Sequence, residues 1–63
     1  MKIIRTDNFG RESRSDFLVA ENIKSDLFGK IMENALNSTF SGPESSDFFK
    51  LVEDNYKLYV FEP

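Results

Sequence analysis

The stretch IKSDLFGKIMENALNSTF, residues 23–40, contains the clearest structural signal in this chain of 63 residues. Its large apolar residues recur at spacings of three and four, the period of one face of an α-helix. They form two adjacent rows: Ile23, Leu27, Ile31 and Ala35 in one, and Phe28, Met32 and Leu36 in the other. The pattern predicts one amphipathic helix, about residues 23–40, with its apolar rows packed against the rest of the protein.

The ends of this helix have recognisable signals. Asn22 or Ser25 can cap its start by accepting a backbone N–H, and Asp26 complements the positive end of the helix dipole. Ser41-Gly42-Pro43 ends it, because Gly tolerates the left-handed conformation and Pro cannot continue a helix.

Gly29 lies inside the helix, where it costs about 1 kcal/mol relative to Ala. One interpretation is a close approach of another backbone or partner, and the other is a tolerated surface residue. Because Gly29 belongs to neither apolar row, the sequence favours the surface interpretation.

Short apolar and β-branched runs flank the helix. Ile3–Thr6 and Phe17–Ala20 precede it, and Phe48–Val52 and Tyr56–Phe61 follow it. The last two runs are separated only by residues 53–55, Glu-Asp-Asn, which favour a turn, so they are predicted to form a β-hairpin.

The predicted fold is a single α+β domain, residues 1–63, with one helix packed on an antiparallel sheet of three or four strands. The order of elements is β-β-α-β-β. The predicted core consists of Ile4, Leu18, Leu27, Phe28, Ile31, Met32, Leu36, Leu58 and Val60.

Composition excludes several chemistries. The chain has no Cys and no His, which removes disulfides, imidazole bases, thiol nucleophiles and the usual zinc sites. Its three Gly residues are scattered and form no phosphate-binding motif. We therefore expect no enzyme activity, no cofactor, no catalytic metal and no small-molecule substrate.

Charge and hydropathy bear on partners and location. The net charge is −3, and residues 31–63 hold two basic and six acidic side chains, which disfavours a nucleic-acid partner. No apolar run is long enough for a signal peptide or a membrane span, so the predicted location is cytoplasmic. So small a domain often depends on oligomerisation.

Arg5, Arg11 and Arg14 form the only concentration of basic residues. They are suited to gripping an acidic partner or a phosphate. The alternative, which the interleaved Asp7, Glu12 and Asp16 favour, is a solvated surface of balanced charge.

The aromatic last strand suggests where a partner binds. Alternation places Tyr56, Leu58 and Val60 on the face that is predicted to meet the helix, and leaves the other face open. The predicted interaction surface on that open face consists of Phe48, Lys50, Lys57, Tyr59 and Phe61. A protein partner or self-association is expected there, and strand addition limited by Pro63 is one mode of contact. Base stacking by a single-stranded nucleic acid is the alternative.

The segments LVAEN, residues 18–22, and YKLYVFEP, residues 56–63, resemble parts of short uncharacterised proteins of bacterial and phage genomes. The resemblance covers about a third of the chain and brings no site residue with it. It implies a small accessory protein of the kind that acts by occluding a larger protein.

Overall fold

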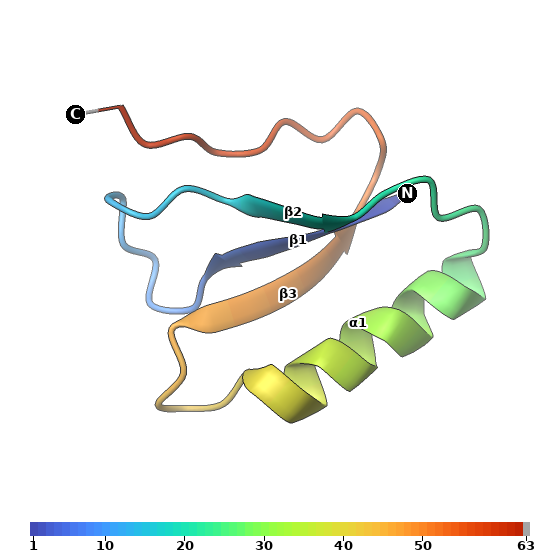
Figure 1. Ribbon diagram of the computed structural model, residues 1–63, viewed down its shortest axis with the longest axis horizontal. Helices are drawn as coiled ribbons and strands as arrows, with labels where there is room; N and C mark the ends of the chain where they lie inside the picture. The colour runs from blue at the N-terminus through green and yellow to red at the C-terminus, as the bar shows by residue number, and fades with distance from the viewer. Residues whose placement is uncertain (63) are drawn as a thin grey trace.

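The computed structural model describes residues 1–62 and contains one helix beside a three-stranded sheet (Figure 1). The elements follow the order β1 (Lys2–Asp7), β2 (Phe17–Ala20), α1 (Asp26–Phe40) and β3 (Asp47–Val52). The sheet is antiparallel throughout, with the spatial order β2-β1-β3. The predicted α+β class is confirmed, but residues 1–62 have the element order β-β-α-β in place of the predicted β-β-α-β-β.

Both faces of the central strand β1 are covered. Ile3 and Ile4 point to opposite faces because they are consecutive in a strand, yet both are 0% exposed. Ile3 pairs with Leu51, whose side chain lies against α1. Ile4 pairs with Lys50, whose ammonium lies 5.5 Å from the ring centre of Tyr56. The helix therefore covers one face, and the residues after β3 cover the other.

The segment after β3, residues 53–62, forms no strand, so the predicted β-hairpin is wrong. A turn does follow β3, in which the Tyr56 N–H donates to the Glu53 carbonyl at 3.0 Å. The chain then runs back on the side of the sheet opposite to α1 (Figure 1). The Asp16 N–H donates to the Tyr59 carbonyl and the Tyr59 N–H donates to Asp16 Oδ2, both at 2.8 Å.

The hairpin is absent because β3 has no free edge to offer. One edge of β3 pairs with β1 over the whole strand, from Lys2↔Val52 to Asp7↔Asp47. The other edge is bonded by side chains of α1, as described below. The predicted limit on strand pairing at Pro63 lies outside the described residues.

The helix begins at Asp26, three residues after the predicted start, and ends at Phe40 as predicted. The Ser25 hydroxyl accepts a hydrogen bond from the Phe28 N–H at 3.2 Å, which identifies Ser25 rather than Asn22 as the N-cap. Asp26 occupies the first turn as predicted. At the other end the Ser41 N–H donates to the Asn37 carbonyl at 3.0 Å, and the chain leaves the helix there.

The predicted core is wrong for most of its members. Among large apolar residues that the structure describes, the buried ones are Ile3, Ile4 and Phe49. The predicted core residues that are exposed are Leu18, Leu27, Phe28, Ile31, Met32 and Val60. Leu36 and Leu58 are partly buried. The principal cause is the rotation of α1 about its own axis, which turns its apolar rows away from the sheet.

Candidate interaction surface

The side of α1 that faces the sheet is polar, and it bonds the outer edge of β3. The Asn37 amide nitrogen donates to the Phe49 carbonyl, and the Phe49 N–H donates back to Asn37 Oδ1, both at 2.9 Å. One turn earlier, Glu33 Oε2 accepts the Leu51 N–H at 2.6 Å. These three bonds satisfy the backbone groups that an edge strand normally presents to another chain. They also fix which face of α1 points toward the sheet.

Gly29 lies on the same side of α1 and allows the helix to approach β3 closely. It is the one buried residue of α1. A Cβ at this position would lie 2.8 Å from Leu51 Cδ1 and 3.3 Å from Ile23 Cγ2. The expectation of a tolerated surface glycine is therefore wrong, and the close-approach interpretation describes the site.

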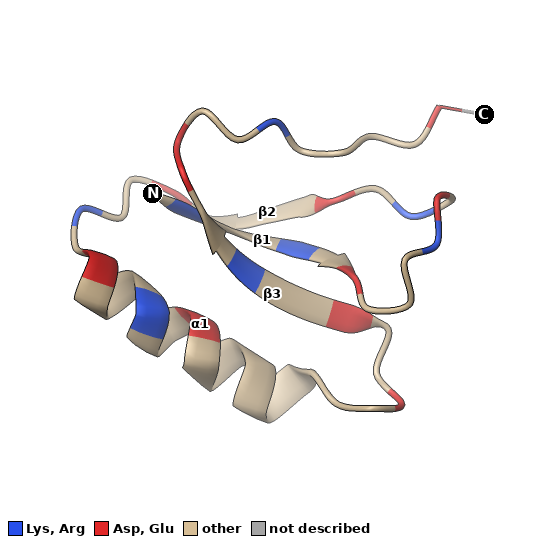
Figure 2. Cartoon of the chain, turned by 180° about the vertical axis from the view of Figure 1, so that it is seen from behind, with Lys and Arg blue, Asp and Glu red and all other residues tan. Residues whose placement is uncertain are grey.

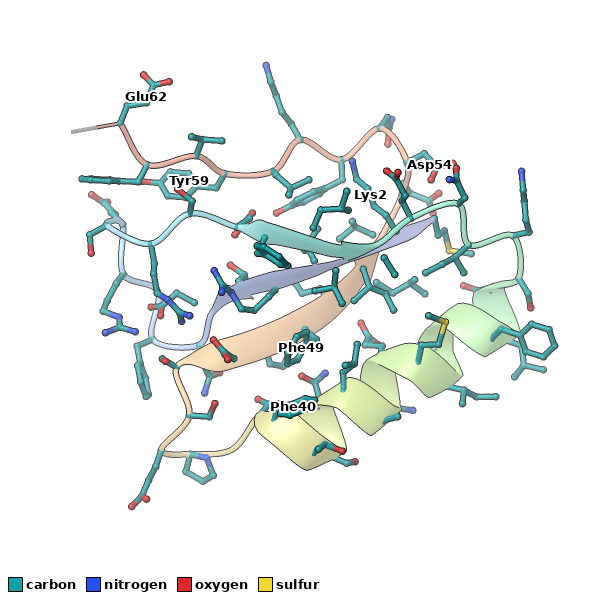
Figure 3. The ribbon with its side chains drawn as sticks, viewed as in Figure 1. Lys2, Phe40, Phe49, Asp54, Tyr59 and Glu62 are labelled. Atoms are coloured by element: carbon teal, nitrogen blue, oxygen red, sulfur yellow. The ribbon has the colours of Figure 1, made fainter. Side chains whose placement is uncertain are left out.

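An aromatic pair holds the C-terminal end of α1 against the sheet. The rings of Phe40 and Phe49 lie with their centres 6.2 Å apart and tilted by 55° (Figure 3), a favourable arrangement for two aromatic side chains. Phe49 is 7% exposed and Phe40 is 57% exposed, so this contact lies at the edge of the small core.

The opposite side of α1 is apolar and uncovered. Successive residues of a helix are rotated by about 100°. A helix that points Gly29, Glu33 and Asn37 toward the sheet therefore points Leu27, Phe28 and Ile31 away from it. The exposed fractions are 64% for Leu27, 64% for Phe28, 55% for Ile31 and 39% for Met32. We call these four residues the outer helix face.

No charged side chain belongs to the outer helix face. The charged residues of α1 are Asp26, Lys30 and Glu33, and the helix has none from residue 34 to residue 40 (Figure 2). Lys30 Nζ lies 3.7 Å from Asp26 Oδ2, one helical turn away, and both side chains are about two-thirds exposed. The exposed apolar stripe is thus bordered, near its N-terminal end, by the ion pair between Lys30 and Asp26.

The predicted interaction surface lies on the other side of the molecule. Phe48 and Lys50 belong to β3, and Lys57, Tyr59 and Phe61 belong to the segment 53–62 (Figure 1). Phe48, Tyr59 and Phe61 are all exposed. Some of these groups already have internal partners, since Lys50 lies over the Tyr56 ring and the Tyr59 hydroxyl donates to the Glu12 carbonyl at 2.6 Å.

Arg5, Arg11 and Arg14 bind carboxylate and carbonyl groups of the same chain. Arg11 donates to both carboxylate oxygens of Asp7, at 2.6 and 3.0 Å. Arg14 bridges Asp7 Oδ1 at 3.1 Å and Asp47 Oδ1 at 2.7 Å, and Arg5 donates to the Ser15 carbonyl at 3.2 Å. This network fastens the loop after β1 to the start of β3.

The same network shifts the pKa values of the Asp7, Arg11 and Arg14 side chains. The Asp7 side chain is only 4% exposed. The hydrogen bonds from Arg11, joined by that from Arg14, hold the pKa of Asp7 well below its usual range. The pKa of Arg11 is raised by its bonds to Asp7, and that of Arg14 by its bonds to Asp47 and Asp7. The three groups are therefore charged at neutral pH.

An open hollow of about 450 Å³ lies between the start of α1 and the end of β3. Its volume lies within the range of small-molecule sites, but it is open to solvent rather than enclosed. Its lining residues are Met1, Asp26, Lys30, Leu51, Val52, Glu53, Asn55 and Tyr56. Two of its ionisable groups, Asp26 and Lys30, pair with each other.

Comparison with known proteins adds no relative: no family model, curated protein or solved structure matches this chain. Within residues 1–62, no helix has both the length and the apolar character needed to cross a membrane.

The apolar rows of the sequence predict a side of α1 that packs on the sheet, whereas the structure exposes most of their members. The residues that indicate the true orientation are Gly29, Glu33 and Asn37, which follow one another at intervals of four on the opposite side of the helix.

Proposed function

We propose that this protein is a non-catalytic protein-interaction module that binds its partner through the outer helix face. The observation on which the proposal rests is the exposure of Leu27, Phe28, Ile31 and Met32 in one stripe of a helix whose other side is bonded to the sheet. Isolated exposed apolar residues are common on proteins, but contiguous stripes of this kind mark interaction sites.

The exposed fractions give the size of the stripe. With roughly 200 Å² for each fully exposed large side chain, the four exposed fractions correspond to roughly 450 Å² of apolar surface. Removing that area of this chain from water contributes about 11 kcal/mol of hydrophobic free energy, before the costs of association and without counting the partner's surface. Those costs are about 4–15 kcal/mol, so the area alone does not set an affinity, and the proposal is supported by the apolar residues being contiguous.

The geometry of the helix suggests the mode of binding. An amphipathic helix that offers residues at spacings of three and four is a common recognition element, because its side chains enter a groove or another helix together. A module of this kind acts by joining two proteins or by occluding a surface of a larger protein.

Binding of a single-stranded nucleic acid is less well supported. Stacking would use Tyr59 and Phe61, with Lys50 and Lys57 nearby. Lys50 lies over the Tyr56 ring and the Tyr59 hydroxyl donates to the Glu12 carbonyl, so both groups already have partners within the chain. A net charge of −3 also opposes a phosphate backbone.

Affinity capture from cells that produce the protein tests the proposal. The bait proteins are the natural chain, the double variant Leu27→Gln/Ile31→Gln, and the control Val60→Gln. Val60 is 62% exposed, like Leu27, but lies outside α1. Gln is a good helix former and changes no charge.

We expect proteins, including further copies of the chain, to be retained by the natural chain and the control but not by the double variant. Each captured protein is then purified and titrated by calorimetry. Equal binding to all three baits would contradict the assignment of the surface.

A further inference from the structure

We infer that the occupant of the outer helix face is a second copy of this chain, held in an antiparallel pair of α1 helices about a two-fold axis near Ile31. This inference rests on the proposed function, and it specifies the partner.

The thinness of a single copy is the first observation that points to a second one. Its Cα atoms extend over 35 × 26 × 12 Å, and the large apolar residues buried within residues 1–62 are Ile3, Ile4 and Phe49. Domains below about 70–80 residues rarely have a sufficient core, and disulfides, metals or oligomerisation compensate. The chain has no Cys, and residues 1–62 contain no group of three potential metal ligands. Of these means, oligomerisation is the one for which the structure offers a surface.

The exposed area matches the need of a dimer. A standard interface covers about 800 Å² on each partner, and homodimer interfaces are about 65% apolar, so each copy must supply roughly 500 Å² of apolar surface. The outer helix face supplies roughly 450 Å² on the basis of its four exposed fractions. The next exposed residue along the stripe, Ala35, is small and allows two helices to approach closely.

The charge distribution suits self-association. Because the stripe contains no charged residue, two copies meet there without burying like charges. Lys30 is paired with Asp26 of its own helix and lies at the margin. An antiparallel arrangement also places each positive helix end near the negative end of its partner. Residues 27–35 are centred on Ile31, which therefore lies near the axis.

Sedimentation equilibrium at micromolar concentration measures the mass. We expect twice the 7.3 kDa of one chain for the natural protein and for Val60→Gln, and 7.3 kDa for Leu27→Gln/Ile31→Gln. Disulfide trapping keeps the test independent of whether the double variant folds. The chain has no natural Cys, so Ile31→Cys introduces a single thiol, and the exposed loop residue Glu44 provides the control Glu44→Cys.

Under mild oxidation, Ile31→Cys should form a covalent dimer at least ten times faster than Glu44→Cys. Equal rates, or a natural protein that stays at 7.3 kDa at all concentrations, would overturn the inference. A monomer whose captured partner still requires the outer helix face would refute the second copy and leave the proposed function standing. A dimer that persists in the folded double variant would place self-association on another surface and would refute a second copy at the outer helix face.

Discussion

Replacement of Asn37 by Ala tests the orientation of α1 on the sheet. Its side chain donates to the Phe49 carbonyl and accepts the Phe49 N–H, both at 2.9 Å, so the substitution leaves two partly buried backbone groups without partners. Asn34 provides the matched control, because it is the same residue type in the same helix and is exposed. Both substitutions improve helix propensity equally, so their difference isolates the two hydrogen bonds.

The expected magnitudes follow from these contacts. Asn34→Ala should stabilise the protein by about 0.5 kcal/mol, the gain in helix propensity. Asn37→Ala receives the same gain but loses two hydrogen bonds worth about 1 kcal/mol each, so it should destabilise by about 1.5 kcal/mol. The difference of about 2 kcal/mol corresponds to a separation of roughly 10 °C in Tm for a domain of this size.

Urea unfolding followed by circular dichroism at 222 nm measures the free energy of unfolding of both variants. Protein concentration must be identical in all samples, because association shifts apparent stability. If Asn37→Ala proves as stable as Asn34→Ala, Asn37 does not bond β3, and the apolar rows of α1 are free to face the sheet.

Two further substitutions probe the same contacts and the loop network. Gly29→Ala should gain less than the about 1 kcal/mol that an exposed helix glycine gives, because a Cβ 2.8 Å from Leu51 Cδ1 forces the Leu51 side chain to move. A gain of the full amount would show that this position is open. The natural protein should lose stability as the pH falls below about 4, since the pKa of Asp7 is lower in the folded chain than in the unfolded one. Asp7→Asn should lose less between pH 7 and pH 3 in urea titrations, and an identical loss would contradict the role of Asp7.

The sequence predicted the helix well and its orientation badly, for a physical reason. The i,i+4 rows and the Ser25 cap are local features, and local features decide where a helix begins and ends. The apolar rows show that one face of α1 avoids water, but they do not show what covers it. Leu27 and Ile31 were therefore assigned to the core of the same chain. The structure leaves them exposed, and a surface between two chains has the same pattern.

Residues 56–61 show that local propensity can also predict an element that does not form. Residues 56–61 have strong β propensity, and the turn before them is formed, yet no strand pairs there. Strand formation needs a free partner edge, and the edge of β3 is already bonded by Glu33 and Asn37. These two residues occupy what appeared to be solvent positions of an amphipathic helix. Propensity alone could not indicate that polar helix side chains replace a strand.

Isotope-filtered nuclear Overhauser spectroscopy on a mixture of labelled and unlabelled chains tests the orientation of α1 most directly. Within one chain, we expect contacts between the Asn37 side-chain amide and the Phe49 N–H, and none between the Ile31 methyl groups and Ile3. Contacts of Ile31 should instead arise between chains. An Ile31–Ile3 contact within a single chain would show that the apolar rows pack on their own sheet, and would contradict the outer helix face as an association surface.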